Sequence, residues 1–179
     1  EFRRSIERNP ASLDACGCYA VLLDFLGRFE EATANMEHAL SVNPMASFAQ
    51  QIYGSTLYIQ RRYQEAVGRF QRALELEPEN MFAREDLVAS LILLGRVQEA
   101  ITVAARPERP SALLAWSYAA AGRRSDAETM LRKMIANPGP DIYPIAVAYF
   151  QLGERDRGFE WLTKVFDAKD IYAAYARVS

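Results

Sequence analysis

One interval of 34 residues recurs along this chain and constrains its fold more than any other feature. It separates two sets of residues: Pro10, Pro44 and Pro78, and Ala32, Ala66 and Ala100. A constant interval of this length indicates stacked structural units, each too small to bury its apolar face alone. The chain is therefore expected to build its core between neighbouring units rather than around a single centre.

A seven-residue motif that ends at each of those alanines marks a hinge between two helices. Its five copies are 26–32, 60–66, 94–100, 121–127 and 152–158. A glycine at the second position, such as Gly27, suits the left-handed residue that ends a helix. Arg61 replaces that glycine in the second copy, which predicts either a small local strain or a different turn. Acidic residues follow in the first turn of the next helix, where the helix dipole favours them.

Apolar residues at helical spacing on both sides of each hinge predict pairs of antiparallel helices. The predicted pairs span 12–26 and 29–42, 46–60 and 63–76, 80–94 and 97–105, 109–121 and 124–136, and 141–152 and 155–168. Pro107 and Pro110 shorten the second helix of the third pair, since proline cannot continue a helix interior. The interval from Ala100 to Ala127 is accordingly only 27 residues.

The second unit carries the most complete set of repeat residues: Tyr53, Gly54, Leu57, Ala66, Phe70, Ala73 and Pro78. This pattern resembles tetratricopeptide repeats, and the resemblance covers essentially the whole chain. It implies an all-α fold: a right-handed superhelical solenoid of about five helix–turn–helix repeats, irregular at repeat three, with a partial N-terminal helix. The implied repeats are 11–44, 45–78, 79–107, 108–139 and 140–170. Small residues such as Ala20 and Gly54 are expected where two helix backbones approach closely.

Both ends of the sequence are expected to be incomplete repeats. Residues 1–10 match the end of a truncated preceding repeat, and residues 171–179 begin a further helix or cap. Glu1 and Phe2 are compatible with a cloning remnant. Because repeat arrays normally need a polar capping helix, this sequence predicts a fragment of a longer protein or ends covered by self-association.

The resemblance also implies that the first helices of successive repeats line a concave groove. The family register places these residues on it: Val21, Phe25, Phe48, Gln51, Tyr58, Phe82, Glu85, Ile92, Trp116, Tyr143 and Phe150. Asp24 falls on the same stripe. The surface lacks the lysines, arginines and asparagines with which some members hold the acidic carboxylate tails of chaperones. We therefore expect an apolar or amphipathic peptide partner, anchored by Tyr58, Phe82 and Trp116; packing against neighbouring helices is the alternative role for each side chain.

Composition argues against catalysis and against several kinds of ligand. His38 is the only histidine, and Cys16 and Cys18 are the only cysteines, so we expect no catalytic, cofactor-binding or metal-binding residue. His38 is expected to face solvent, and the two thiols to be buried or half-buried. A net charge of -2 argues against direct nucleic-acid binding. No stretch reaches the ~18 apolar residues of a membrane span, and the few cysteines favour a cytoplasmic location.

Three functions remain open at this point. The first is a non-enzymatic scaffold for protein–protein interaction. The second is a regulatory or sensory module, because residues 146–170 resemble the terminal repeat of arrays that follow bacterial winged-helix transcription regulators, nucleotide cyclases or serine/threonine kinases. Eighteen arginines against three lysines are also typical of a GC-rich bacterial genome. The third is self-association into a homo-oligomer, and an enzyme is the least favoured function.

Overall fold

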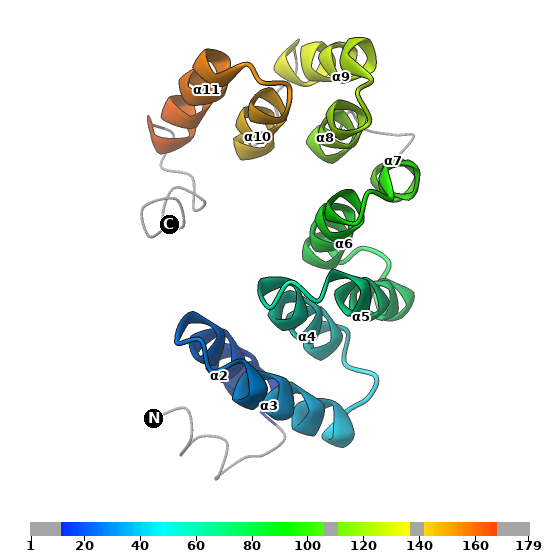
Figure 1. The fold of residues 1–179 in the computed structure, drawn as a ribbon, viewed down its shortest axis with the longest axis vertical. Coiled ribbons are helices and arrows are strands. Elements are labelled where there is room, and N and C mark those ends of the chain that lie inside the picture. Colours follow the sequence, from blue (N-terminus) through cyan, green and yellow to red (C-terminus); the bar gives the residue numbers. More distant parts are fainter. Residues whose placement is uncertain (1–11, 106–110, 137–141, 168–179) are drawn as a thin grey trace. The chain divides into compact units, whose positions relative to one another are not determined.

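The computed structural model describes residues 12–105, 111–136 and 142–167. These residues form ten α-helices and no β-strand, which confirms the predicted all-α class (Figure 1). The helices are α2 (Leu13–Phe25), α3 (Phe29–Val42), α4 (Ser47–Ile59), α5 (Tyr63–Leu76), α6 (Met81–Leu93), α7 (Val97–Ala104), α8 (Ala112–Ala120), α9 (Arg124–Ala136), α10 (Tyr143–Gln151) and α11 (Arg155–Asp167).

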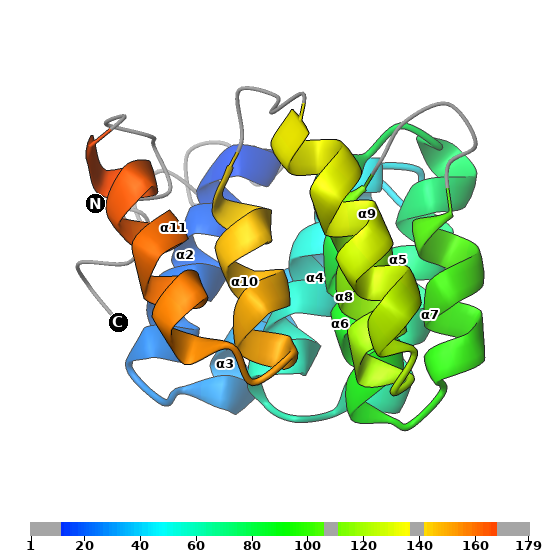
Figure 2. The same cartoon turned by 90° about the horizontal axis from the view of Figure 1, so that it is seen from above.

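The helices group into two compact units, Glu1–Arg96 and Val97–Ser179. In the first unit α2 packs against α3 and α4 against α5, and the first helices α2, α4 and α6 also contact one another in that order. In the second unit α8 packs against α9 and α10 against α11, and Figure 2 shows α10 and α11 side by side. The first helices α8 and α10 are again in contact. Each unit is thus a stack of helical hairpins.

The five hinges share one backbone geometry. Gly27, Gly95, Gly122 and Gly153 have φ between +70° and +77°, and Arg61 has φ +60° at the equivalent place. At the first hinge the amide of Arg28 donates to the carbonyl of Leu23 over 2.8 Å, and the amide of Gly27 donates to that of Asp24 over 3.0 Å. This pair of hydrogen bonds is the Schellman motif that ends a helix. The predicted helix ends are confirmed to within one residue, and Arg61 adopts the same left-handed turn as the glycines rather than a different turn.

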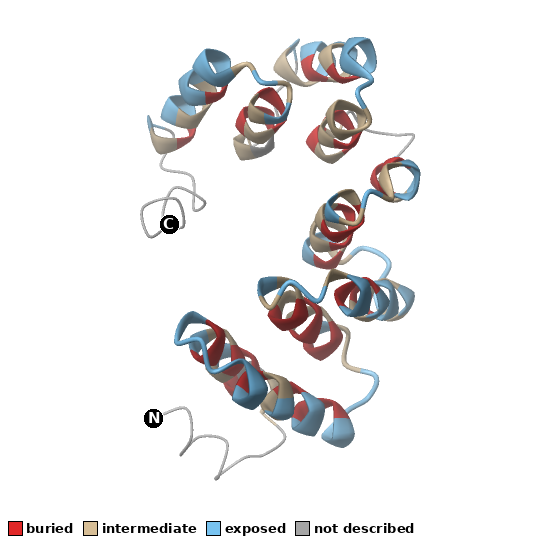
Figure 3. Ribbon diagram, in the orientation of Figure 1, coloured by how far each residue is buried: buried red, intermediate tan, exposed pale blue. Residues whose placement is uncertain are grey.

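Figure 3 shows buried residues on the facing sides of paired helices such as α4 and α5, and many of the buried residues are small. Ala20, Ala32, Ala66, Ala100 and Ala127 are all completely buried. Larger side chains such as Phe70 fill the space between these close approaches and are also completely buried. Close-packed side chains of this kind supply most of the stability of short helices, which are marginal in isolation.

Two predicted helix starts are wrong by two or three residues. α8 begins at Ala112 rather than 109, because Ser111 is its N-cap and its hydroxyl accepts a hydrogen bond from the Leu114 amide over 3.4 Å. α10 begins at Tyr143 rather than 141, with a proline in its first turn. The expected partial repeats at 1–10 and 171–179, together with Pro107 and Pro110, lie outside the described residues.

Candidate partner-binding face

The first helices of the first unit expose a series of large apolar side chains. Phe25 on α2 is 81% exposed, Phe48 on α4 is 43% exposed and Phe82 on α6 is 56% exposed. Ile59 and Leu93 are also exposed at the ends of α4 and α6. The half-buried members of the predicted set in this unit are Val21, Gln51, Tyr58, Glu85 and Ile92. We call the surface formed by these residues of α2, α4 and α6 the first-helix face.

Phe48 has a packing role as well as an exposed surface. A Cβ added to Gly17 on α2 would lie 3.3 Å from Cε1 of Phe48, so the ring of Phe48 closely approaches the backbone of the preceding first helix. The side chain of Ile52 lies beside the same glycine. Phe48 therefore joins α2 to α4 while part of its ring stays open to solvent.

Tyr58 is held between a first and a second helix. Its ring lies edge-on to Tyr63 of α5, with 5.4 Å between centroids and 62° between planes. Burial raises the pKa of Tyr58, and the nearby charges of Tyr63 and Asp86 raise it further. The hydroxyl consequently stays protonated at neutral pH and can donate a hydrogen bond.

Asp86 is a polar residue of this surface that the sequence analysis missed. Its Oδ2 accepts a hydrogen bond from Ser55 Oγ across α6 and α4, over 2.9 Å. Gln51 Nε2 donates to the same hydroxyl over 3.2 Å. Burial raises the pKa of Asp86, while the hydrogen bonds from Ser55 and Gln51 act in the opposite direction. The sequence does contain a signal for it: Asp86 lies one repeat interval of 34 residues after Ile52, at a position where the preceding repeats have the apolar residues Ile52 and Cys18.

Asp24 is buried, and its placement on the open stripe was wrong. Only 5% of it is exposed, and its Oδ1 accepts a hydrogen bond from Gln60 Nε2 of the next hinge over 3.5 Å. Its Oδ2 has no hydrogen-bond partner in the described part of the chain. Burial raises the pKa of Asp24, and Thr56 and Gln60 lower it by less. Asp24 therefore links two successive repeats rather than facing a partner.

The second unit places its predicted residues differently. Trp116 on α8 and Tyr143 and Phe150 on α10 are all half-buried. The ring of Phe150 lies where a Cβ on Gly158 would fall, 2.6 Å from Cε1, and it meets Phe159 edge-on at 5.2 Å. Phe150 therefore fills the space between α10 and α11. The indole N–H of Trp116 is buried and has no hydrogen-bond partner within residues 12–105, 111–136 and 142–167.

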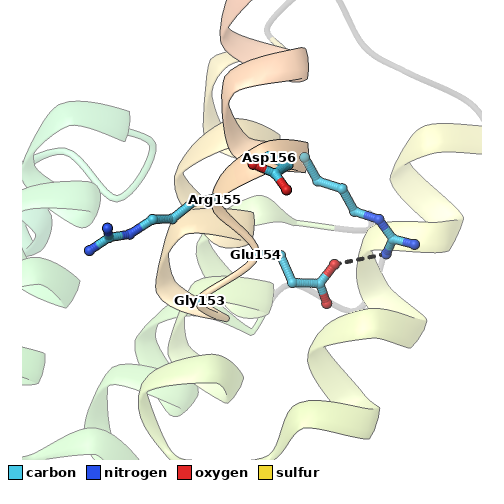
Figure 4. A pocket seen from close by; sticks show the side chains of 5 residues that line it. Gly153, Glu154, Arg155 and Asp156 are labelled. Atoms are coloured by element: carbon cyan, nitrogen blue, oxygen red, sulfur yellow. Dashed lines mark ion pairs between the residues drawn. The ribbon is translucent and has the colours of Figure 1, made fainter.

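A pocket of ≈ 410 Å³ lies at the start of α11 and is lined by consecutive residues Gly153–Arg157 (Figure 4). Figure 4 shows Glu154 in an ion pair, and its Oε2 is 2.9 Å from Nη1 of Arg157. Glu154 also pairs with Arg124 of α9. Its carboxylate is thus matched by two guanidinium groups, and the surrounding charges connect α9 to α11.

The thiols and the histidine do not converge on a site. Cys16 is buried and Cys18 is exposed, so the prediction of a shielded thiol is wrong for Cys18, because side chains two apart on a helix face different sides. His38 is exposed, as predicted. Among the described residues no group of three His, Cys, Asp or Glu side chains could hold a metal ion. None of the described helices has the length and hydropathy of a membrane span.

Similar folds occur among solved structures. YrrB, a TPR protein with an unusual peptide-binding site, is 22% identical, with 99% of this chain and 98% of YrrB covered at a TM-score of 0.61. PilF of Pseudomonas aeruginosa is 20% identical, with 92% and 79% covered at a TM-score of 0.64. A thermophilic TPR protein of Thermus thermophilus is 20% identical, with 93% and 96% covered at a TM-score of 0.63. At these identities the likeness concerns the fold alone.

Family models give the same assignment from the sequence side. Two models described as tetratricopeptide repeat match residues 13–44 and 54–112, about half of the 179 residues. A comparison with curated protein sequences gives no significant match. The hairpin stack, the left-handed hinges and these two matched segments agree with one another, and the chain belongs to the tetratricopeptide repeat family.

Proposed function

We propose that this chain is a non-enzymatic interaction scaffold that binds a peptide or an amphipathic helix on the first-helix face. The observation that carries the proposal is the set of exposed phenylalanines Phe25, Phe48 and Phe82 on three adjacent first helices. Aromatic side chains grouped on an open surface are typical of binding sites, because covering them removes a large apolar area from water. Because the three rings lie on successive helices, they suit an extended or helical segment of a partner protein.

Residue chemistry supports an apolar rather than an anionic partner. No lysine or arginine occurs on α2 or α4, and α6 contains only Arg84, which donates to the carbonyl of Pro78, so the face has few cations to hold a carboxylate tail. The exposed rings instead favour leucine, methionine or aromatic side chains on the partner. Gln51 and the hydroxyl of Tyr58 can orient the partner backbone through hydrogen bonds.

The experiment is affinity capture from lysate of the native host, with the partner identified by mass spectrometry. The double variant Phe25→Ala, Phe82→Ala should lose the captured protein, because it removes the two most exposed rings of the face. Phe159→Ala is the matched control, since Phe159 is 59% exposed but lies on the second helix α11. Equal capture by the wild type and by a folded double variant would show that the partner binds elsewhere.

A regulatory module is the second candidate, and the likeness of residues 146–170 to terminal repeats of bacterial signalling proteins favours it. In such a protein the same face would bind a partner or another domain. The complete open reading frame tests this directly. An adjoining DNA-binding, cyclase or kinase domain supports it, and an array without an effector domain removes it. Light scattering over a wide concentration range separates both candidates from self-association.

A further inference from the structure

Asp86 and its neighbour Glu85 are the acidic residues of a surface that is otherwise mostly apolar. The carboxylate of Asp86 lies where α6 faces α4, and its hydrogen-bond partners are the neutral side chains of Ser55 and Gln51. Ser55 Oγ is 2.9 Å from Oδ2, and Asp86 as a whole is only half-buried. The carboxylate is therefore partly withdrawn from water, and the residue keeps some exposure to solvent.

The three helices that form this face have an acidic balance. α2 and α4 contain no lysine or arginine, and α6 contains only Arg84. The guanidinium of Arg84 donates to the carbonyl of Pro78 in the loop before α6. Of the acidic residues of the three helices, Glu85 and Asp86 are half-buried on α6, whereas Asp24 is buried between repeats. A partner with a positive charge is complementary to such a surface, both for steering and for final contact.

Aromatic rings lie on both sides of the carboxylate along the helices. Phe82 precedes Asp86 by one helical turn on α6, and its ring is 56% exposed. On α4, Tyr58 follows Ser55 by one turn. Because α4 and α6 are adjacent first helices, the anion has an apolar neighbour towards each end of the face.

A carboxylate in this setting is incompletely solvated. Burial raises the pKa of Asp86, and the hydrogen bonds from Ser55 and Gln51 lower it by less. A cation brought by a partner would replace the missing water, and its attraction is stronger where water is excluded. Lysine and arginine suit the flanking rings too, since their apolar stems cover aromatic surface and their charges attract ring faces.

Resting on the proposed function, we propose that the first-helix face recognises a segment in which one lysine or arginine lies between apolar side chains. The cation pairs with the carboxylate of Asp86, and the apolar side chains cover Phe82 and Tyr58. The partner is therefore a basic amphipathic peptide. Ser55 and Gln51 keep the carboxylate in place for this contact.

The test begins with selection from a phage library of random dodecapeptides on the immobilised full chain. The peptides enriched by the wild type should share a lysine or arginine flanked by apolar residues. One selected peptide is then labelled, and its affinity is measured by fluorescence anisotropy. Asp86→Asn should weaken binding about tenfold, and replacing the peptide's cation by glutamine should weaken binding to the wild type by a similar factor. Both changes together should cost no more than either alone.

Glu75→Gln is the control variant, because it removes the same charge from α5, where Glu75 pairs with Arg72 over 2.7 Å. It should bind like the wild type. Circular dichroism checks that Asp86→Asn is folded, and the peptide replacement needs no protein variant at all. Enrichment of apolar peptides without a cation, or unchanged affinity in Asp86→Asn, overturns this inference and leaves the proposed function intact. Absence of any enriched peptide overturns both.

Discussion

The ring of Phe70 lies directly against the backbone of Gly54. A Cβ built on Gly54 would be 2.4 Å from Cε1 of Phe70, and Phe70 itself is completely buried. This contact sets how closely α4 and α5 approach within the second repeat. It also explains why a residue with low helix propensity stands in the middle of α4.

Gly54→Ala should therefore lower the free energy of unfolding by about 1–3 kcal/mol, because the added methyl group must displace a buried ring. Urea unfolding followed by circular dichroism measures this. Gly68→Ala on α5 is the control, since a Cβ there meets nothing within 4 Å. It should leave stability unchanged or raise it by about 0.5–1 kcal/mol through helix propensity. Equal effects at both sites would contradict the close contact.

Arg61→Gly should stabilise the protein by about 1 kcal/mol, because Arg61 holds φ +60° at a hinge where four other repeats use glycine. Gly95→Ala is the reciprocal change at φ +73°, with open space around its Cβ. It should destabilise by a similar amount for purely conformational reasons. If Arg61→Gly has no effect while Gly95→Ala does, contacts of the Arg61 side chain compensate its strain.

The hinges and hairpin contacts could be predicted because they repeat with the sequence period. Gly95 and Arg61 occupy one position of the motif, which predicted the left-handed turn at Gly95 but left strain or a different turn open at Arg61. The contact of Ser55 with Asp86 could not be found this way, because it joins residues 31 apart across two repeats. Such a contact depends on which side of α6 turns towards α4. Phe150 shows the same limit: whether its ring faces a partner or Gly158 depends on one side-chain rotamer.

The two cysteines should differ sharply in reactivity. Cys16 is completely buried and burial raises its thiol pKa, whereas Cys18 is exposed on the other side of α2. An aromatic disulfide reagent should modify the exposed thiol of Cys18 quickly in the native protein. It should modify Cys16 only after unfolding, because the thiolate is the reacting form and burial disfavours it. Cys18→Ser should abolish the fast phase. Two fast thiols in the native protein would contradict the orientation of α2.

Asp24 should make stability depend on pH in a defined direction. Its native pKa is raised, mainly by burial, so the native state binds the proton more tightly than the unfolded chain. The resulting stabilisation is fully present below the unfolded pKa of about 4 and is lost as the pH rises through the native pKa. Asp24→Asn stays neutral and can still accept the hydrogen bond from Gln60. Its stability relative to the wild type should therefore increase between mildly acidic and neutral pH.

Glu65→Gln supplies the comparison with the opposite sign. The hydrogen bond from Arg62 lowers the pKa of Glu65, so its contribution is present above the unfolded pKa and is lost as the pH falls. The free energy of unfolding of Glu65→Gln relative to the wild type should thus be highest at acidic pH, where the wild-type carboxylate is protonated. Urea unfolding by circular dichroism over a pH series measures both differences. A difference for Asp24→Asn that stays constant across the series would mean that Asp24 titrates alike in the native and unfolded states, despite its burial between two repeats.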